Sequence, residues 1–368
     1  MIHSGAATTP IGETPKGGLA CEEAGASAAD VPWSQKTVLV TGATGFLGFH
    51  VATRLVREGA SVRALVRSLS KASRLIQGGV TCIQGELNDS STLLRACQGC
   101  EYLFHLAGVV NFGADLDLIR RVNVEGTRGV LEAARSTGVR RLVYTSSIVT
   151  VGASRRPEVL DERAHWNLGH LSVPYVNTKR EAEELVLSAA GGSVEAVVVN
   201  PGIVVGPDDF FKSAFGTLCY RFWRGRVPFY FDGGGCFVDV RDVARGHLLA
   251  ARQGRSGARY ILGGENMTYG KFFQALARAS GMRIFRLRLP LAVAPVVGWL
   301  NDRLMAHRSG RSYLTSTEVP LLSLYFYSDS VRARQELGYH SRPIQTSLAD
   351  AYRFWCGKDG KGRFSWPC

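Results

Sequence analysis

The sequence predicts an α/β fold in which a doubly wound parallel sheet is joined to a smaller, mostly helical C-terminal lobe. Short runs rich in β-branched residues alternate with helical stretches, and a glycine-rich turn follows the first run. The runs are apolar almost throughout, which is typical of strands in a sheet that is buried on both faces. Alternation of such strands with helices makes the sheet parallel, with helices on each side.

Six strands are expected in the first part of the chain. They are 37–42, 61–67, 80–87, 101–108, 140–147 and 194–202. The helical stretches between them are 46–59, 90–99, 117–138 and 175–190. The stretch 208–235 is aromatic and turn-rich, and is expected to form an inserted lobe. The pattern then returns to strand and helix at 236–251 and to a strand at 259–264, and the remainder is mostly helical.

Gly42, Gly45 and Gly48 follow the first strand directly and lie where the first helix begins. In such a turn, the first glycine permits the tight bend and the second lets backbone N–H groups approach a pyrophosphate. The third allows the helix to pack closely on the strand, and the phosphates lie at the positive end of that helix. This context predicts a dinucleotide-binding (Rossmann) unit.

The residue at the end of the second strand indicates which dinucleotide binds. Many NAD-binding proteins have an acidic residue there, which binds the ribose hydroxyls. Here Arg67 stands at the strand end, and Lys71 follows it. A guanidinium can bind a 2′-phosphate through two charge-assisted hydrogen bonds, whereas a carboxylate would repel it. NADP(H) is therefore expected ahead of NAD(H), and the alternative is that Arg67 is simply a solvated charge.

Composition excludes some classes of partner. The 368 residues carry a net charge of +13, but the basic residues are scattered and do not show the basic-aromatic pattern of nucleic-acid binders. The eight cysteines have neither disulfide nor zinc spacing, so a reduced, cytoplasmic protein without a metal site is expected. Cys97 and Cys100 are interpreted as the end of a helix that leads into a strand.

An apolar run at 289–300 is too short to span a membrane and contains two prolines. It is expected to pack inside the fold, and contact with a membrane surface is the weaker alternative. The predicted domain organisation is a disordered N-terminal tail at 1–34, a dinucleotide-binding domain at 35–205 and 236–264, a substrate lobe at 206–235 and 265–356, and a C-terminal tail at 357–368.

Tyr175 precedes Lys179 by four residues, so both side chains lie on one side of a helix. This pair belongs to a set of short motifs. They are TGATGFLG (41–48), FHLAG (104–108), VNVEGT (122–127), VYTSSIVTVG (143–152), YVNTK (175–179) and VNPGIVVGP (199–207). Through them the chain resembles the extended short-chain dehydrogenase/reductase family, within the NAD-dependent epimerase/dehydratase superfamily, over residues 37–354. It looks most like the dihydroflavonol 4-reductase and 3β-hydroxysteroid dehydrogenase branch, and is also similar to hopanoid-associated sugar epimerases.

The resemblance implies a catalytic set of Ser147, Tyr175 and Lys179, with Ser146 as the alternative serine. A free tyrosine has a pKa of about 10 and gives up its proton reluctantly at neutral pH. A neighbouring ammonium stabilises the phenolate and brings that pKa toward the working range. The serine donates to the substrate oxygen, where negative charge grows as hydride arrives. Tyr175 then gives that oxygen a proton in reduction, or takes one in oxidation.

The resemblance also implies which residues hold the cofactor. Besides the turn glycines, Arg67, Lys71, Tyr175 and Lys179, they are Thr44, Phe46, Leu47, Glu86, Leu87, Leu106, Ala107, Gly108, Pro201 and Ile203. Glu86 and Leu87 stand at the adenine position, where the family more often has Asp, and Pro201 and Ile203 at that of the nicotinamide carboxamide. Asn123 is either a structural bridge between helix and sheet or a catalytic residue, and the sequence leaves both open.

Three functions remain open from the sequence. The favoured one is an NADP-dependent oxidoreductase acting on a carbonyl or secondary alcohol of a small, largely apolar substrate. The alternative is a nucleotide-sugar epimerase or dehydratase, but such proteins usually clamp the substrate diphosphate with an arginine where this chain has Gly235 and Cys236. A non-catalytic NADP-binding regulatory protein is disfavoured because Ser147, Tyr175 and Lys179 are all present.

The inserted stretch bears on the substrate through its aromatic residues. They are Phe210, Phe211, Phe215, Tyr220, Phe222, Trp223, Phe229, Tyr230 and Phe231. Most are expected to form the core of the lobe, and a few to face a flat or apolar ligand. Arg221, Arg224 and Arg226 keep an anionic substrate open. The resemblance further implies a homodimer formed through two helices.

Overall fold

Residues 33–110, 115–282, 287–293 and 319–357, together with 296, 299 and 303, are described in a computed structural model of the protein. Most of the N-terminal tail and residues 358–368 of the expected C-terminal tail lie outside these described residues. Trp33, placed in the tail by the sequence, is 2% exposed and packs edge-on against Tyr102 at a ring distance of 5.1 Å. Ordered packing therefore begins before the boundary predicted at residue 34.

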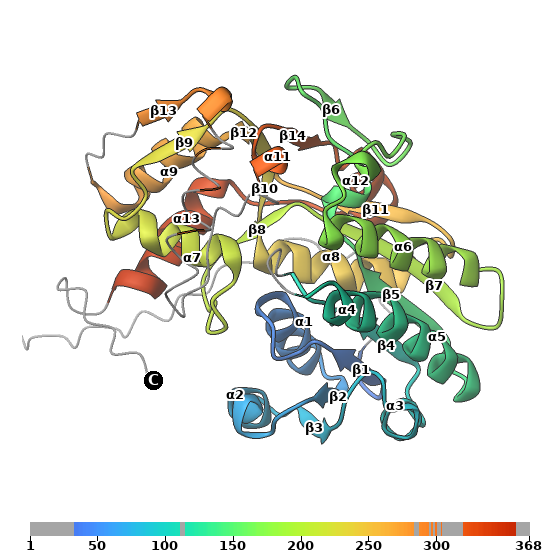
Figure 1. The fold of residues 1–368 in the computed structure, drawn as a ribbon. Helices are drawn as coiled ribbons and strands as arrows, with labels where there is room; N and C mark the ends of the chain where they lie inside the picture. The colour runs from blue at the N-terminus through green and yellow to red at the C-terminus, as the bar shows by residue number, and fades with distance from the viewer. Residues whose placement is uncertain are drawn as a thin grey trace, which may run out of the picture. The chain divides into compact units, whose positions relative to one another are not determined.

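Seven parallel strands form the central sheet, in the order β3-β2-β1-β4-β5-β7-β11 (Figure 1). Their bounds are β1 Thr37–Thr41, β2 Ser61–Val66, β3 Thr81–Gln84, β4 Tyr102–His105, β5 Arg141–Thr145, β7 Glu195–Pro201 and β11 Arg259–Leu262. Each lies within a strand predicted from the apolar runs, and every neighbouring pair is parallel. The doubly wound α/β prediction is confirmed.

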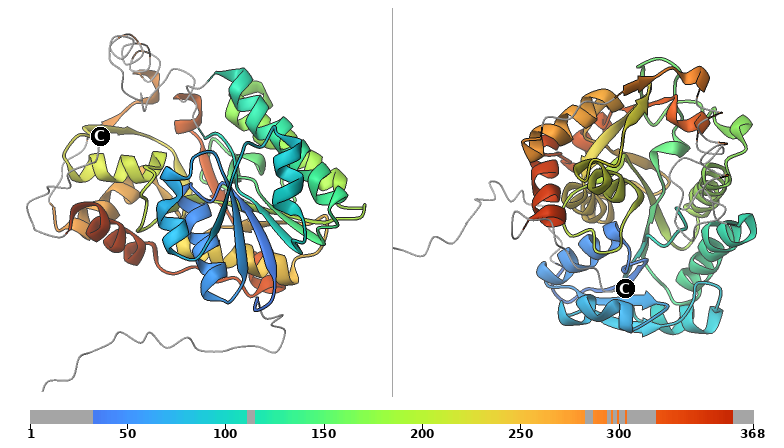
Figure 2. Two further views of the ribbon diagram at one scale, coloured as in Figure 1. Left: turned by 90° about the horizontal axis from the view of Figure 1, so that it is seen from below. Right: turned by 60° about the vertical axis from the view of Figure 1, so that its left-hand side comes forward.

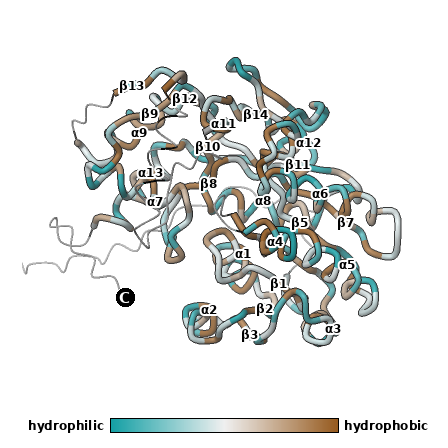
Figure 3. The backbone as a smooth tube through the Cα atoms, viewed as in Figure 1, coloured by the Kyte–Doolittle hydropathy of each residue, from teal (hydrophilic) through white to brown (hydrophobic). Residues whose placement is uncertain are grey.

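Helices cover both faces of this sheet because successive residues of each strand point to opposite faces. Val38 and Val40 pack in one core with the helices α1 (Phe46–Arg57), α8 (Val240–Gln253) and α12 (Val331–Leu337). Leu39 packs in a second core with helices on the other face. These are α3 (Ser90–Cys97), α5 (Gly126–Ser136) and α6 (Pro174–Ala189). Figure 2 shows the sheet between the two helical layers, and Figure 3 shows hydrophobic residues along its strands.

Shorter elements complete this part of the chain. They are a 3-10 turn η1 (Ser70–Ala72), the helices α2 (Ser73–Gln77) and α4 (Leu116–Arg120), the π-helical turn η2 (Arg121–Glu125) and the 3-10 turns η3 (Ile148–Thr150) and η4 (Gly169–Leu171). The end of α3 at Cys97 leads into β4, as Cys97 and Cys100 were interpreted to do. Both cysteines are buried and unoxidised.

A second sheet belongs to the lobe beside the central sheet. It contains β8 (Ile203–Val205), β10 (Gly234–Asp239), β12 (Glu265–Thr268), β14 (Tyr325–Ser328) and β6 (Val159–Leu160). Around it lie α7 (Ala214–Trp223), α9 (Tyr269–Ser280), α11 (Val319–Leu322), α13 (Ile344–Cys356) and the 3-10 turn η5 (Leu291–Val293), with the strand pair β9 (Phe229–Phe231) and β13 (Leu287–Leu289). The sequence anticipated the lobe but not its sheet, and it assigned most of β10 to the other domain. The domain division itself stays a prediction.

The lobe is fixed to the central unit by aromatic and ionic contacts. The ring of Phe210 lies 5.6 Å from that of Phe49 on α1 and 5.1 Å from that of Phe354 on α13. Arg342 binds both carboxylate oxygens of Asp242 on α8, with Nε donating to Oδ2 at 3.0 Å and Nη2 to Oδ1 at 2.7 Å. Because Phe49 lies in the first turn of α1, which starts just beyond the end of β1, the contact with Phe210 places the lobe next to the carboxyl edge of the parallel strands.

We expect replacement of Trp33 by Ala to lower the free energy of unfolding by about 3–5 kcal/mol, the usual cost of removing a large aromatic side chain from a core. Urea denaturation followed by circular dichroism measures this change. Trp299→Ala is the matched control, because Trp299 is 56% exposed and its loss is expected to cost no more than about 0.5 kcal/mol. Equal unfolding free energies for the two variants would contradict the packing of Trp33.

Candidate active site

The glycine turn between β1 and α1 has the close contacts that its sequence predicts. Gly42 has a φ of +74°, and a Cβ there would lie 2.5 Å from the backbone nitrogen of Ala107. A Cβ on Gly48 would overlap the carbonyl oxygen of Gly42, so only glycine lets α1 start this close to β1. Gly45 precedes the first residue of α1, and its N–H donates to the Gly42 carbonyl at 2.9 Å. The turn is thus a cradle free of side chains at a helix N-terminus, which fits a pyrophosphate.

Backbone contacts lead from this turn to Lys179. Leu106, Ala107 and Gly108 follow β4, and the turn packs directly on the first two. A Cβ on Gly108 would lie 3.9 Å from Nζ of Lys179. The turn, the segment after β4 and the lysine therefore share one edge of the sheet, where the parallel strands have their carboxyl ends. Open α/β sheets bind their ligands at this edge.

Tyr175 lies in the first turn of α6, after Pro174 has begun the helix. Its ring is 7% exposed and belongs to an apolar cluster that includes Ile148 and Ile261. Burial raises the pKa of the Tyr175 hydroxyl above its ordinary value, and a hydrogen bond with the side chain of Ser147 opposes this rise. The ring is thus packed in hydrocarbon while its hydroxyl meets a polar partner, so the group is held protonated and aimed at the serine.

The two candidate serines differ in their surroundings. Ser147 is half-buried, precedes η3 and meets Tyr175. Ser146 is buried, and its Oγ lies 3.1 Å from Oγ1 of Thr150. The geometry therefore favours Ser147 as the partner of the tyrosine, and Ser146 as part of the packing beneath the loop.

Lys179 lies one helical turn after Tyr175 and is 6% exposed. Its Nζ donates to the carbonyl oxygen of Thr145 at 2.6 Å and lies 4.5 Å from the centre of the Tyr144 ring. Burial lowers the pKa of Lys179 to about 7, and the negative charge of Glu183 opposes this shift. The lysine can therefore gain or lose its proton near neutral pH.

Asn123 has the contacts of a structural bridge. Its Oδ1 accepts a hydrogen bond from the Val109 N–H at 2.8 Å, and its Nδ2 donates to the Val109 carbonyl at 3.3 Å and to Oγ1 of Thr178 at 3.1 Å. It thus ties η2 to the segment after β4 and to α6. Of the two roles that the sequence left open, these contacts favour the structural one.

His105 and Glu183 are buried polar residues near the site that the sequence interpretation missed. His105 lies 2.7 Å from Oγ1 of Thr41 and 3.0 Å from Oγ1 of Thr127, and burial lowers its pKa to about 3, so it is neutral. Glu183 lies eight residues after Tyr175 and four after Lys179. This spacing places all three on one face of α6, and could have identified Glu183 from the sequence.

The residues expected at the adenosine end lie on the outer part of the same edge. Arg67 follows β2 and is exposed, and no carboxylate pairs with its guanidinium among the residues that the structure describes. Its carbonyl accepts a hydrogen bond from Nε2 of Gln84 at the end of β3, at 3.4 Å. Lys71 in η1 and Glu86 after β3 are also exposed, whereas Leu87 is half-buried against α5.

The remaining predicted cofactor residues occupy the turn and the end of β7. Thr44 and Leu47 are half-buried, and Phe46 is buried beside His50, with ring centres 5.6 Å apart. Pro201 is the last residue of β7, and Ile203 is the first of β8. Their roles toward a cofactor stay predictions.

Gly235 and Cys236, which stand where nucleotide-sugar enzymes usually have a diphosphate-binding arginine, lie inside the lobe. Cys236 is fully buried in β10, and a Cβ on Gly235 would overlap the side chain of Ile203. Of the aromatic residues of the inserted stretch, Phe222, Trp223 and Phe231 are buried in the lobe core and the others are half-buried. This distribution agrees with a lobe core made largely of aromatic rings.

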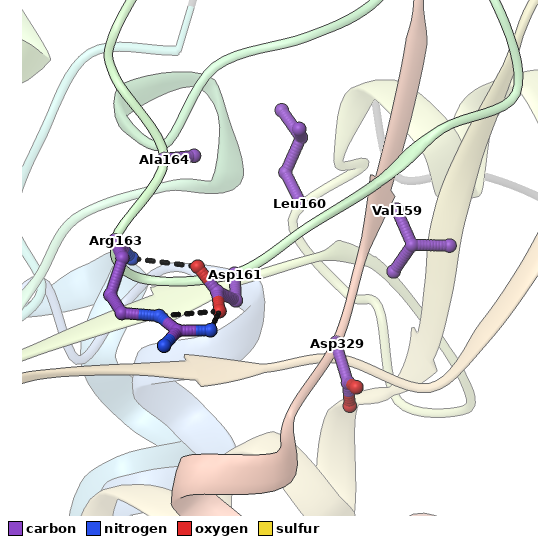
Figure 4. Close-up of a pocket in the computed structure, with 6 residues that line it drawn as sticks. All are labelled: Val159, Leu160, Asp161, Arg163, Ala164 and Asp329. Atoms are coloured by element: carbon purple, nitrogen blue, oxygen red, sulfur yellow. Dashed lines mark hydrogen bonds and ion pairs between the residues drawn. The ribbon is translucent and has the colours of Figure 1, made fainter.

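Two hollows of the described surface lie away from this set. One is lined by Val159, Leu160, Asp161, Arg163, Ala164 and Asp329, where Arg163 pairs with Asp161 at 2.6 Å (Figure 4). An adjoining hollow lies between the ends of β11 and β14 and includes Asn266 and Arg334. Ser147, Tyr175 and Lys179 line neither hollow.

The apolar run at 289–300 packs on the fold at its first residue, Leu289, which lies half-buried against Phe231, but not at the later apolar positions Val293, Val296 and Trp299. Val296 is 63% exposed and Trp299 is exposed as well, and Arg303 lies 5.5 Å from the centre of the Trp299 ring. The expectation of burial is wrong for these residues, because hydrophobicity alone does not show which apolar segments find a packing partner. Within the described residues, no helix combines the length and the hydrophobicity needed to cross a bilayer.

Comparison with known proteins identifies the family of the chain. Residues 38–263 match the model of the NAD dependent epimerase/dehydratase family. The chain is 34% identical to a putative dihydroflavonol 4-reductase of Synechocystis, over 86% of this chain and 93% of the relative. It is also 34% identical to sterol demethylase protein B of Methylococcus capsulatus, over 86% of this chain and 97% of the relative. The crystal structure of gox2253 is similar with a TM-score of 0.77 and 31% identity, covering 87% of this chain and 98% of that chain. The chain therefore belongs to the NAD dependent epimerase/dehydratase family, as an NAD(P)-dependent oxidoreductase of the extended short-chain dehydrogenase/reductase type.

Proposed function

We propose that the protein is an NADP-dependent reductase of a carbonyl group in a small, largely apolar substrate. The convergence of Ser147, Tyr175 and Lys179 at the carboxyl edge of the sheet, next to the glycine turn, is the observation that supports it most. All three groups that a reductase of this kind needs are present, and the segment Leu106–Gly108 lies between Lys179 and the dinucleotide cradle. A non-catalytic regulatory role would leave this set without a purpose.

The roles follow from the surroundings of each side chain. A bound reduced nicotinamide supplies the hydride. Ser147 is placed to donate a hydrogen bond to the substrate oxygen as it gains negative charge. Tyr175, held protonated by its burial, is placed to give that oxygen its proton. Lys179, in its ammonium form, stabilises the phenolate that remains, and the carbonyl of Thr145 orients it.

The preference for NADP(H) rests on Arg67 and Lys71. Both are exposed beyond β2, the strand next to β1 in the sheet, and the guanidinium of Arg67 has no acidic partner among the described residues. A guanidinium without a partner can bind a 2′-phosphate in a bidentate manner. This assignment goes beyond the family match, which supports NAD(P) in general.

An apolar substrate is supported by the lobe and by the relatives. The closed packing around Gly235 and Cys236 leaves no room for the arginine that nucleotide-sugar enzymes use, which weighs against the epimerase alternative. Half-buried aromatic residues, among them Phe215 and Tyr230, can offer flat apolar surfaces to a ligand. Two similar proteins carry names that refer to a dihydroflavonol and a sterol, and both words denote molecules built on fused rings.

We expect Tyr175→Phe to lower kcat by at least about 10²-fold, because the proton donor is lost, and Ser147→Ala to lower it by about 10²–10³-fold. The measurement is the absorbance of NADPH with a panel of aliphatic, steroid and flavonoid ketones. Ser146→Ala is the matched control, and we expect it to keep most of the activity because its hydroxyl meets Thr150. Activity of Tyr175→Phe equal to that of the wild type would exclude the proposed mechanism.

Arg67→Asp is expected to weaken NADPH binding by about 10- to 100-fold, since two charge-assisted hydrogen bonds are replaced by repulsion, and to change NADH binding less than about threefold. Fluorescence titration with each nucleotide gives both affinities. Arg140→Asp is the control, because Arg140 is exposed at the amino end of β5, opposite the site. If the wild type binds both nucleotides equally well, the role of Arg67 is refuted.

A further inference from the structure

Glu183 is a fully buried carboxylate at the back of the proposed site. Its Oε2 lies 2.6 Å from Oγ1 of Thr150 and accepts a hydrogen bond from Nδ2 of Asn200 at 2.7 Å. Its Oε1 accepts from Nη1 of Arg259 at 2.8 Å. Arg180, on the same helix, lies farther away at 3.7 Å. A buried charge is stable only when it is paired and hydrogen-bonded, and these contacts meet both conditions.

The same contacts reach the backbone of the proposed serine. Asn200 donates from Nδ2 to the carbonyl of Ser147 at 3.2 Å, and Oγ1 of Thr150 lies 2.7 Å from that carbonyl. Both residues therefore lie between Glu183 and the loop that carries Ser147. Thr150 closes η3, Asn200 belongs to β7 and Arg259 to β11, so one carboxylate joins three elements under the loop.

Arg259 is held in place independently of the carboxylate. Its Nη2 and Nε donate to the carbonyl of Glu162 at 2.7 and 3.3 Å. The side chain of Glu162 accepts in turn from the N–H of Ile261, at 2.9 Å. The guanidinium therefore has a position that does not depend on Glu183, and it acts as a fixed counter-ion for that carboxylate.

Glu183 also acts on Lys179, which lies one helical turn before it. The carboxylate favours the charged lysine and opposes the effect of burial on its pKa. The other titratable groups around the ammonium are His105, which is neutral at neutral pH, and the protonated phenols of Tyr144 and Tyr175. Among the described residues, the negative charge that supports the ammonium is thus that of Glu183.

We propose that Glu183, held by Arg259, is the positioning residue of the site: it keeps Lys179 in its ammonium form and fixes the backbone that carries Ser147. This inference rests on the proposed function for the roles of Ser147 and Lys179. The effect of Glu183 on the charge of Lys179, however, can be measured without any turnover of substrate. A purely structural ion pair between Glu183 and Arg259 would hold the fold together without changing the titration of Lys179. The protonation of the lysine therefore distinguishes the two interpretations.

The test is the pH dependence of NADPH binding, measured by nucleotide fluorescence between pH 5.5 and 9 on the full-length protein. We expect the wild type to lose affinity as pH rises through the pKa of Lys179, because the ammonium becomes neutral. In Glu183→Gln the midpoint is expected to lie about one pH unit lower, since removal of a nearby negative charge destabilises a cation. Glu184→Gln is the matched control: Glu184 is the next residue, exposed and paired with Arg180 at 2.7 Å, and its midpoint is expected to match the wild type.

Lys179→Met identifies the titrating group, and we expect it to bind NADPH weakly with a flat profile over this range. Glu183→Asp keeps the charge and is expected to restore a midpoint close to that of the wild type. A Glu183→Gln midpoint equal to that of Glu184→Gln would overturn the proposal. The same conclusion follows if Lys179→Met retains the wild-type profile.

Glu183→Gln leaves the guanidinium of Arg259 buried without its counter-ion, which is a strongly destabilising change. The double variant Glu183→Gln, Arg259→Gln removes both charges, so that no buried charge is left unpaired, and is titrated in the same way after circular dichroism has checked its fold. We expect it to show the lower midpoint too, because the charge acting on Lys179 is that of Glu183. NADPH binding can be measured without knowing the substrate. If Tyr175→Phe loses turnover but the midpoint of Glu183→Gln is unchanged, this inference is refuted and the proposed function is left intact.

Discussion

The hydrogen bond from Lys179 to the carbonyl of Thr145, at 2.6 Å, connects the parts on which the proposed chemistry depends. It joins α6 to the last residue of β5 at the carboxyl edge of the sheet. The side chain of Thr145 lies 2.8 Å from Nε2 of His247 on α8, so the same residue also contacts the opposite helical layer. The position of the lysine is thus set by both layers of the fold and does not depend on α6 alone.

Burial has opposite consequences for the two titratable groups on α6. It disfavours the charged form of each, so it raises the pKa of Tyr175 and lowers that of Lys179. Without a further charge, the result would be a phenol and a neutral amine. The buried carboxylate of Glu183 favours the ammonium and so opposes the effect of burial on the pKa of Lys179, and a bound oxidised nicotinamide would add a second positive charge beside the phenol. The charged form of the lysine is therefore supported by the carboxylate of Glu183, and the phenolate form of the tyrosine would be supported by the positive nicotinamide ring.

The central sheet could be predicted because its strands are continuously apolar and lie between amphipathic helices. The catalytic pair could be predicted because a spacing of four residues fixes a shared helix face. The second sheet could not, since β8 has only three residues and β10 pairs with β8, β12 and β14, which come from separate parts of the chain. Arg259 could not be matched to Glu183 for the same reason, as 76 positions separate them.

For the run 289–300, the expectation of burial failed at Val293, Val296 and Trp299 for a different physical reason. Its composition is that of a core segment, but burial requires a complementary surface, and no pattern within the run itself shows whether one exists. The same limit applies to Ser146 and Ser147, which are adjacent and chemically identical. Only the direction of each side chain, toward Thr150 or toward Tyr175, distinguishes them.

The ring of Phe210 has a consequence for how the protein exchanges its ligands. It lies against Phe49, Phe354 and the guanidinium of Arg74, which is 4.0 Å from its centre. A hinge movement that swung the whole lobe away would expose these faces to water and separate Arg342 from Asp242. Ligand exchange by such a movement would therefore cost both the apolar contacts of the Phe210 ring and this ion pair, which favours smaller movements of individual segments.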